Sequence, residues 1–160
     1  MKYALTYGLM SGLVIIAVIM AGLLLGPEGG ITHSHWFGYS VMLVALTFIF
    51  VGVKRYRDLE RGGVIRFLPA FGVGLATAIV AGIAYVLTWE TYLALSGYNF
   101  VEDYAATYAR QMAADGVPAA RIAADIQWMR DIYASPLSRT AITFLEIFPV
   151  GLLVALVSAA

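Results

Sequence analysis

The sequence predicts an all-α, polytopic membrane protein with four transmembrane helices and an amphipathic helical hairpin between the third and the fourth. Hydrophobic residues make up 61% of the 160-residue chain and charged residues 12%, against roughly 45–50% and about 25% in soluble domains. So small a soluble domain has too much surface to hide this amount of apolar side chain. Long uncharged runs alternate with short charged segments, and we expect residues 1–160 to form a single membrane domain.

The first two expected spans are residues 3–25 and 36–53. Residues 3–25 carry no charge, and a helix of about this length covers roughly 30 Å of hydrocarbon. Because Lys2 precedes the run and no small-residue cleavage site follows it, we interpret the segment as a retained helix rather than a removed signal peptide. The second run starts with Trp36, Phe37 and Tyr39, which are aromatic residues typical of a membrane interface.

A basic loop is expected at residues 54–66, and it orients the other segments. It holds five of the ten basic residues, namely Lys54, Arg55, Arg57, Arg61 and Arg66. Short loops rich in Lys and Arg stay in the cytoplasm, whereas the loop at residues 26–35 has neither. We therefore place the basic loop and both termini on the cytoplasmic side of a bacterial inner membrane. Two roles stay open for these cations: setting topology alone, or binding anionic lipid headgroups.

The third and fourth expected spans are residues 67–95 and 140–160, with a different kind of segment between them. Residues 99–135 are richer in charge and alanine, and apolar residues recur there at helical spacing. Gly116 and Pro118 are a stop and a restart for helices. We predict two amphipathic helices that form an extracytoplasmic hairpin and cap the membrane helices or lie in the lipid interface.

Glu146 is the one ionisable residue well inside an expected span. A carboxyl group at that depth costs several kcal/mol unless it is paired, hydrated or protonated. Pro149 cannot donate to the Leu145 carbonyl, so a free acceptor is expected beside the Glu146 side chain. Two interpretations remain: a proton, cation or ligand site, or a structural Glu that is neutral or paired with Arg.

Glu90 and Arg139 are expected at the outer ends of the third and fourth spans. Glu90 is either a hydrated carboxylate at the interface, or it faces Arg139 or Glu146 and closes a polar pocket. His33 and His35 have a ligand-like spacing, but two ligands are too few for a metal site unless Glu28 and Glu90 complete it. We expect solvated histidines, and therefore no metal and no cofactor.

The residues that several classes of function require do not occur in this sequence. The chain has no Cys, and its formal net charge is zero, so neither thiol chemistry nor nucleic-acid binding is indicated. Paired catalytic carboxylates, a Ser/His/Asp arrangement and a phosphate-binding glycine loop are absent from the sequence. We therefore expect no catalytic residues and no enzyme.

Three stretches, taken together, resemble the bacterial membrane family called domain of unknown function 4199. They are residues 38–58, residues 62–67 with Tyr85 and Trp89, and residues 133–137 leading to 143–151. The resemblance covers nearly the whole chain in the same order. It implies four spans with a hydrophilic insert before the last one, and it implies no activity.

The leading hypothesis is a non-enzymatic membrane protein that self-associates or binds a partner as an accessory subunit. Its basis is the pattern of small residues on the apolar helices together with the expected hairpin. One alternative is a small transporter or ion-coupled carrier that uses Glu146. Another is a lipid-binding or apolar-ligand-binding protein, whose ligand is lost when Tyr104 or Tyr108 is truncated.

Overall fold

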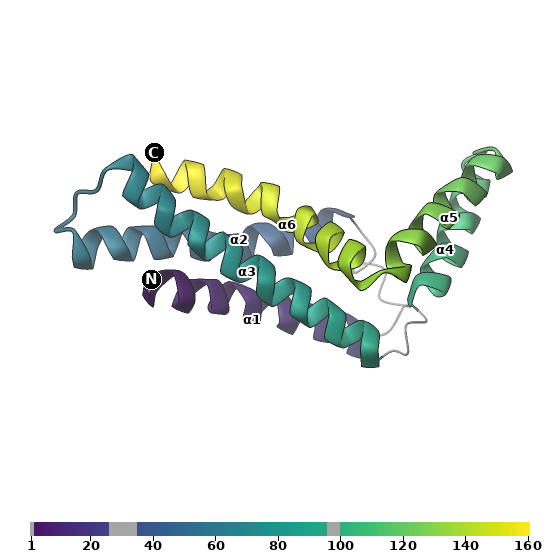
Figure 1. Ribbon diagram of the computed structural model, residues 1–160, viewed down its shortest axis with the longest axis horizontal. Helices are drawn as coiled ribbons and strands as arrows, with labels where there is room; N and C mark the ends of the chain where they lie inside the picture. The colour runs from purple at the N-terminus through teal and green to yellow at the C-terminus, as the bar shows by residue number, and fades with distance from the viewer. Residues whose placement is uncertain (1, 26–34, 96–99) are drawn as a thin grey trace. The chain divides into compact units, whose positions relative to one another are not determined.

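The computed structural model describes residues 2–25, 35–95 and 100–160, and this part of the chain is all-helical, as predicted (Figure 1). No strand occurs within those ranges. The helices are α1 (Lys2–Leu25), α2 (His35–Glu60), α3 (Phe67–Leu95), α4 (Phe100–Ala114), α5 (Ala119–Ala134) and α6 (Pro136–Ala159). The bounds of α3 coincide with the third expected span.

Helix α2 is longer than the expected span, and the loop predicted at residues 54–66 is wrong over its first half. The helix continues to Glu60, because Lys, Arg, Leu and Glu are good helix formers when no Gly or Pro intervenes. The turn that follows the helix contains Gly62 and Gly63, whose φ angles of 62° and 88° only glycine adopts readily. The Gly63 N–H donates to the Arg57 carbonyl at 3.0 Å, which satisfies one of the last carbonyls of the helix.

The predicted break between α4 and α5 is confirmed, and its centre is Gly116 with a φ of 78°. Pro118 stands just before α5 rather than in its first turn. Helix α6 begins at Pro136, four residues before the expected fourth span. Proline fits the first helical position because its missing N–H has no intrahelical partner there.

The chain divides into two units by its internal contacts, Met1–Leu87 with Phe144–Ala160, and Thr88–Thr143. In the first unit, small residues let helices approach closely. A Cβ added to Gly12 of α1 would lie 2.5 Å from the Cβ of Ala84 in α3. A Cβ added to Gly151 of α6 would lie 3.1 Å from the Cβ of Ala78. The expectation that all 160 residues form one domain stays a prediction.

Large apolar side chains of the first unit point outward in many places. Leu13 is 67% exposed, Leu87 62%, Leu153 62% and Val157 77%. The buried positions include many small residues, among them the following: Ala4, Ala45, Ala70, Ala78, Ala81 and Ala155. Larger residues are buried beside them, namely Ile15, Leu46, Ile49, Val53 and Ile147. The first unit therefore buries many small side chains and leaves much of its large apolar surface outside.

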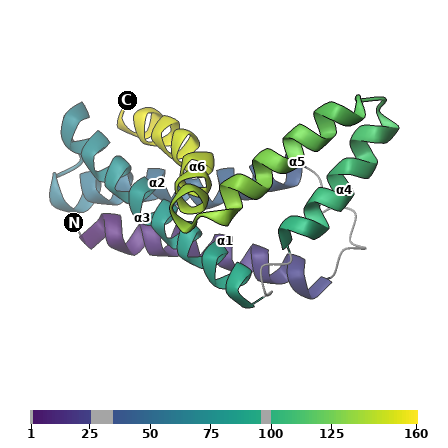
Figure 2. The same cartoon turned by 45° about the vertical axis from the view of Figure 1, so that its right-hand side comes forward.

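The second unit contains the predicted helical hairpin, in which α4 and α5 run side by side (Figure 2). The Tyr108 hydroxyl donates to an Asp125 carboxylate oxygen at 2.9 Å and joins the two helices. Arg130 donates to both oxygens of Glu102, at 3.0 and 2.8 Å. The extracytoplasmic placement of this hairpin stays a prediction.

Two described helices, α3 and α6, are long and apolar enough to cross a membrane by length and composition. The apolar stretch Lys2–Val18 of α1 is shorter. These helices are a weak indication of a membrane location.

Candidate functional site

A nearly buried ion pair joins the end of α3 to the start of α6 within the second unit. Arg139 is 5% exposed, and its Nε and Nη2 donate to the two carboxylate oxygens of Glu90 at 2.7 and 2.6 Å. Its Nη1 donates to the Tyr133 carbonyl at 2.9 Å. Such a two-pronged pair fixes both direction and distance. Of the roles left open for Glu90, the structure shows the pairing with Arg139.

The corner between α5 and α6 explains why Arg139 is held in place. Ser135 is extended, with φ −102° and ψ 124°, as expected before a proline. The Ser138 hydroxyl donates to the Ile132 carbonyl at 2.7 Å and lies 3.1 Å from the Ser135 carbonyl. The backbone that carries the guanidinium is therefore tied to the end of α5, which makes the ion pair a structural clamp.

Glu146 has different surroundings, in the first unit. Its side chain is exposed on α6, and the Tyr85 hydroxyl of α3 donates a hydrogen bond to its carboxyl group. Tyr85 itself packs against the core cluster formed by Ile15, Ala45 and Ile147. Pro149 lies inside α6 one turn later, also exposed.

Tyr85 is a partner of Glu146 that the sequence patterns did not lead us to expect. The sequence alone contained a signal for it, because a tyrosine within an apolar helix needs a partner for its hydroxyl group. Tyr85 and Glu146 are distant in sequence, and only the packing of α3 against α6 brings them together.

The basic residues at the end of α2 differ in their partners. Arg57 Nε donates to Asp58 at 2.8 Å. Arg61 donates to the Tyr56 hydroxyl at 2.8 and 3.0 Å, and its guanidinium lies 5.4 Å from the centre of that ring. Arg66 precedes α3, and its carbonyl accepts a hydrogen bond from the Ala70 N–H at 3.2 Å.

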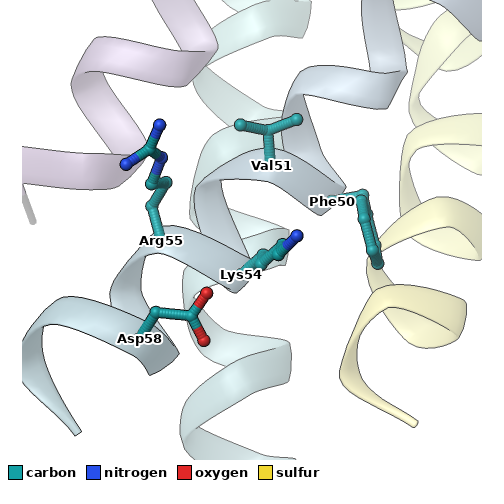
Figure 3. Close-up of a pocket in the computed structure, with 5 residues that line it drawn as sticks. All are labelled: Phe50, Val51, Lys54, Arg55 and Asp58. Atoms are coloured by element: carbon teal, nitrogen blue, oxygen red, sulfur yellow. The ribbon is translucent and has the colours of Figure 1, made fainter. Parts of the chain in front are cut away.

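Lys54 and Arg55 line a surface pocket of about 390 Å³ (Figure 3). Its other lining residues are Phe50, Val51 and Asp58, and all five project from consecutive turns of α2. Phe50 is 50% exposed. The pocket thus joins an apolar part to a cationic part.

The N-terminus of α1 is clamped to the end of α2. Lys2 Nζ lies 2.6 Å from a Glu60 carboxylate oxygen, to which the Tyr3 hydroxyl donates at 3.1 Å. The rings of Tyr3 and Tyr56 meet edge to face at 5.8 Å. The hydrogen bond from Lys2, followed by that from Tyr3, lowers the pKa of Glu60 below its usual value. Lys2 and the basic segment therefore lie at the same end of the first unit.

The described ranges contain no cluster of three or more His, Cys, Asp or Glu side chains that could hold a metal ion. Glu28 and His33 lie outside the described residues, and His35 begins α2 without a described side chain. The histidine hypothesis is therefore not tested.

Comparisons with known proteins identify the family of the chain and assign it no activity. No curated protein and no solved structure matches it. The family described as "Protein of unknown function (DUF4199)" matches residues 2–160. Because this match covers nearly the whole chain, the protein belongs to the DUF4199 family.

Proposed function

We propose that the protein is a four-span membrane protein in which α1, α2, α3 and α6 cross the bilayer. The supporting observation is the packing of the first unit, with small residues at helix contacts and large apolar residues exposed. Water would favour burial of the large residues. Lipid removes that preference, and helix contacts in membranes favour Gly and Ala instead.

The distribution of charge supports one orientation. Six of the ten basic residues are Lys2 and the five between Lys54 and Arg66, and the contact of Lys2 with Glu60 brings them to one end of the first unit. By the positive-inside rule this end is cytoplasmic. The hairpin of α4 and α5 is then extracytoplasmic, in the inner membrane of a bacterium.

Cysteine labelling tests this topology directly, since the natural chain contains no Cys. A membrane-impermeant maleimide added to intact cells should label Asp115→Cys in the hairpin turn. It should label Arg61→Cys only after the membrane is permeabilised. The reverse order would refute the orientation, and equal labelling of both in intact cells would refute the four-span arrangement.

Within this topology we infer a non-enzymatic role, in which the protein self-associates through the face of α6 that carries Glu146. An exposed carboxyl group on an apolar helix is costly in lipid unless it finds a polar partner. Tyr85 supplies one hydrogen bond, which leaves further acceptor sites on the carboxyl group. A second copy that covers this face removes the group from lipid.

The exposed residues on the same face of α6 support self-association through it. Leu153, two turns beyond Glu146, is 62% exposed, and Pro149 between them is exposed as well. Residues spaced by three, four and seven positions share one side of a helix. Together they form a continuous outward face with a polar group at one end, which suits contact with another helix.

Crosslinking in native membranes tests self-association. Leu153→Cys should form a dimer with a short thiol crosslinker, whereas Leu13→Cys on α1, with a matching 67% exposure, should not. Adding Glu146→Leu should weaken the dimer about 3- to 20-fold, since interhelical hydrogen bonds in membranes contribute about 0.6–1.7 kcal/mol. Equal crosslinking at Leu153 and Leu13, or no effect of Glu146→Leu, would contradict the proposal.

A carrier that uses Glu146 is the second candidate, and the Tyr85 hydrogen bond favours it because it gives the carboxyl group a proton-bearing neighbour. This function requires that Glu146→Gln abolish flux in proteoliposomes while the protein stays folded. An absence of flux with the wild type over a broad panel of ions and solutes would refute it.

A further inference from the structure

The pocket on α2 is lined by both charged and apolar side chains. Lys54, Arg55 and Asp58 supply charge, while Phe50 and Val51 supply an apolar wall (Figure 3). Phe50, Lys54 and Asp58 follow one another at four-residue spacing, and Val51 and Arg55 form a parallel row beside them, so the two rows adjoin on the helix surface. The pocket is independent of the Glu146 face on α6.

The side chains of the two pocket cations differ from those of Arg57 and Arg61, which have polar partners among the described residues. Arg57 is engaged by Asp58, and Arg61 by the Tyr56 hydroxyl. Within the described ranges, the side chains of Lys54 and Arg55 make no hydrogen bond and no ion pair. Pairing of Asp58 with Arg57 also moderates the one negative charge that lines the pocket. Among the described residues, the pocket therefore presents two cationic side chains without a polar partner.

We propose that this pocket binds an anionic phospholipid of the surrounding bilayer. Lys54 and Arg55 hold its phosphate, and the start of an acyl chain lies on Phe50 and Val51. A cation near the bilayer surface attracts acidic headgroups, and Lys and Arg both bind phosphate well. Free phosphate would leave the apolar wall unused. The proposal rests on α2 crossing the bilayer, so that the last turns before Glu60 reach the headgroup region.

Native mass spectrometry of the full chain in mild detergent, after removal of lipid, tests the site. The probe is dioleoyl phosphatidylglycerol, and the expected result is one tightly retained molecule per chain. The double variant Lys54→Gln/Arg55→Gln should bind it about 30-fold more weakly, from two cation contacts near the surface. The double variant Arg61→Gln/Arg66→Gln removes two positive charges outside the pocket and should weaken retention clearly less, because solvent and salt screen charges that do not touch the bound phosphate.

Equal weakening in the two double variants would overturn the proposal, because it would show attraction to overall charge. Equal retention of phosphatidylcholine, or competition by inorganic phosphate at the same concentration as the lipid, would overturn it too. Phe50→Ala keeps both cations and should weaken retention several-fold, which keeps the proposal testable if the charge variant fails to fold. Lipid retention by a single chain does not depend on self-association through α6. The lipid-binding proposal and the self-association proposal can therefore fail independently.

Discussion

Breaking the Glu90–Arg139 pair should destabilise the protein in an asymmetric way. The side chain of Arg139 is 6% exposed and that of Glu90 24% exposed. In Glu90→Leu the buried guanidinium loses its anion and cannot reach water. In Arg139→Met the remaining Glu90 carboxylate is closer to solvent, so the decrease in the free energy of unfolding is smaller.

The expected loss of stability for each substitution follows from the exposure of the side chain that remains. Removing one partner of a buried ion pair costs about 3–5 kcal/mol, and we assign Glu90→Leu to this range. Arg139→Met should cost about 2–3 kcal/mol, because partial hydration compensates the orphaned carboxylate. A chain of this length loses about 2–4 °C of Tm per kcal/mol. The double variant Glu90→Leu/Arg139→Met should recover most of the loss, since it leaves no unpaired charge.

Thermal unfolding in mild detergent, followed by circular dichroism, is the measurement. Arg130→Met is a matched control, because the Arg130–Glu102 pair has the same two-pronged geometry but side chains that are 48% and 63% exposed. It should change Tm little, as exposed pairs contribute little. If Glu90→Leu lowered Tm no more than Arg130→Met, or if the double variant were the least stable, the assignment as a buried clamp would be wrong.

Two further predictions concern the first unit. Gly12→Ala should lower the free energy of unfolding by about 1–3 kcal/mol, because its new Cβ is forced against Ala84. Gly72→Ala, with nothing within 4 Å of the new Cβ, should raise the free energy of unfolding by about 0.5–1 kcal/mol. Equal Tm values for the two variants would contradict this. The pKa of Glu60 is lowered below its ordinary 4.5, chiefly by Lys2, so the stability from this contact is complete above that pH and is lost as the pH falls through the folded value. Glu60→Gln should therefore melt slightly below the wild type at pH 7, and the difference should shrink as the pH falls through the folded pKa; a difference that stays constant over the whole acid range would contradict the contact.

Local signals in the sequence predicted the helices well. Residues 67–95 were bounded by a charged segment and a polar one, and α3 has those bounds. Gly116 marked the turn of the hairpin because a positive φ angle favours glycine. The predicted loop is wrong up to Glu60, because a high density of charge does not exclude a helix and the residues from Lys54 to Glu60 favour one.

The partners of polar side chains could not be predicted in the same way. Arg139 was equally compatible with Glu90 and with Glu146 in the sequence, and Lys54 looked the same as Arg57. The choice depends on which helix faces meet and on hydrogen bonds between distant residues. Glu90 and Arg139 are 49 positions apart, and no short-range pattern indicates that their side chains meet.

The two carboxylates on α3 and α6 illustrate how burial and pairing separate a structural role from an interaction role. Glu90 is satisfied by a guanidinium within its own unit, so its loss should appear first as a lower Tm. Glu146 has a tyrosine hydroxyl and an outward position, so its loss leaves the core of the first unit intact. Glu146→Leu should therefore weaken association at nearly unchanged Tm, while Glu90→Leu should lower Tm in the monomer and the dimer alike. A protein in which both substitutions changed Tm equally would have no separate interaction face on α6.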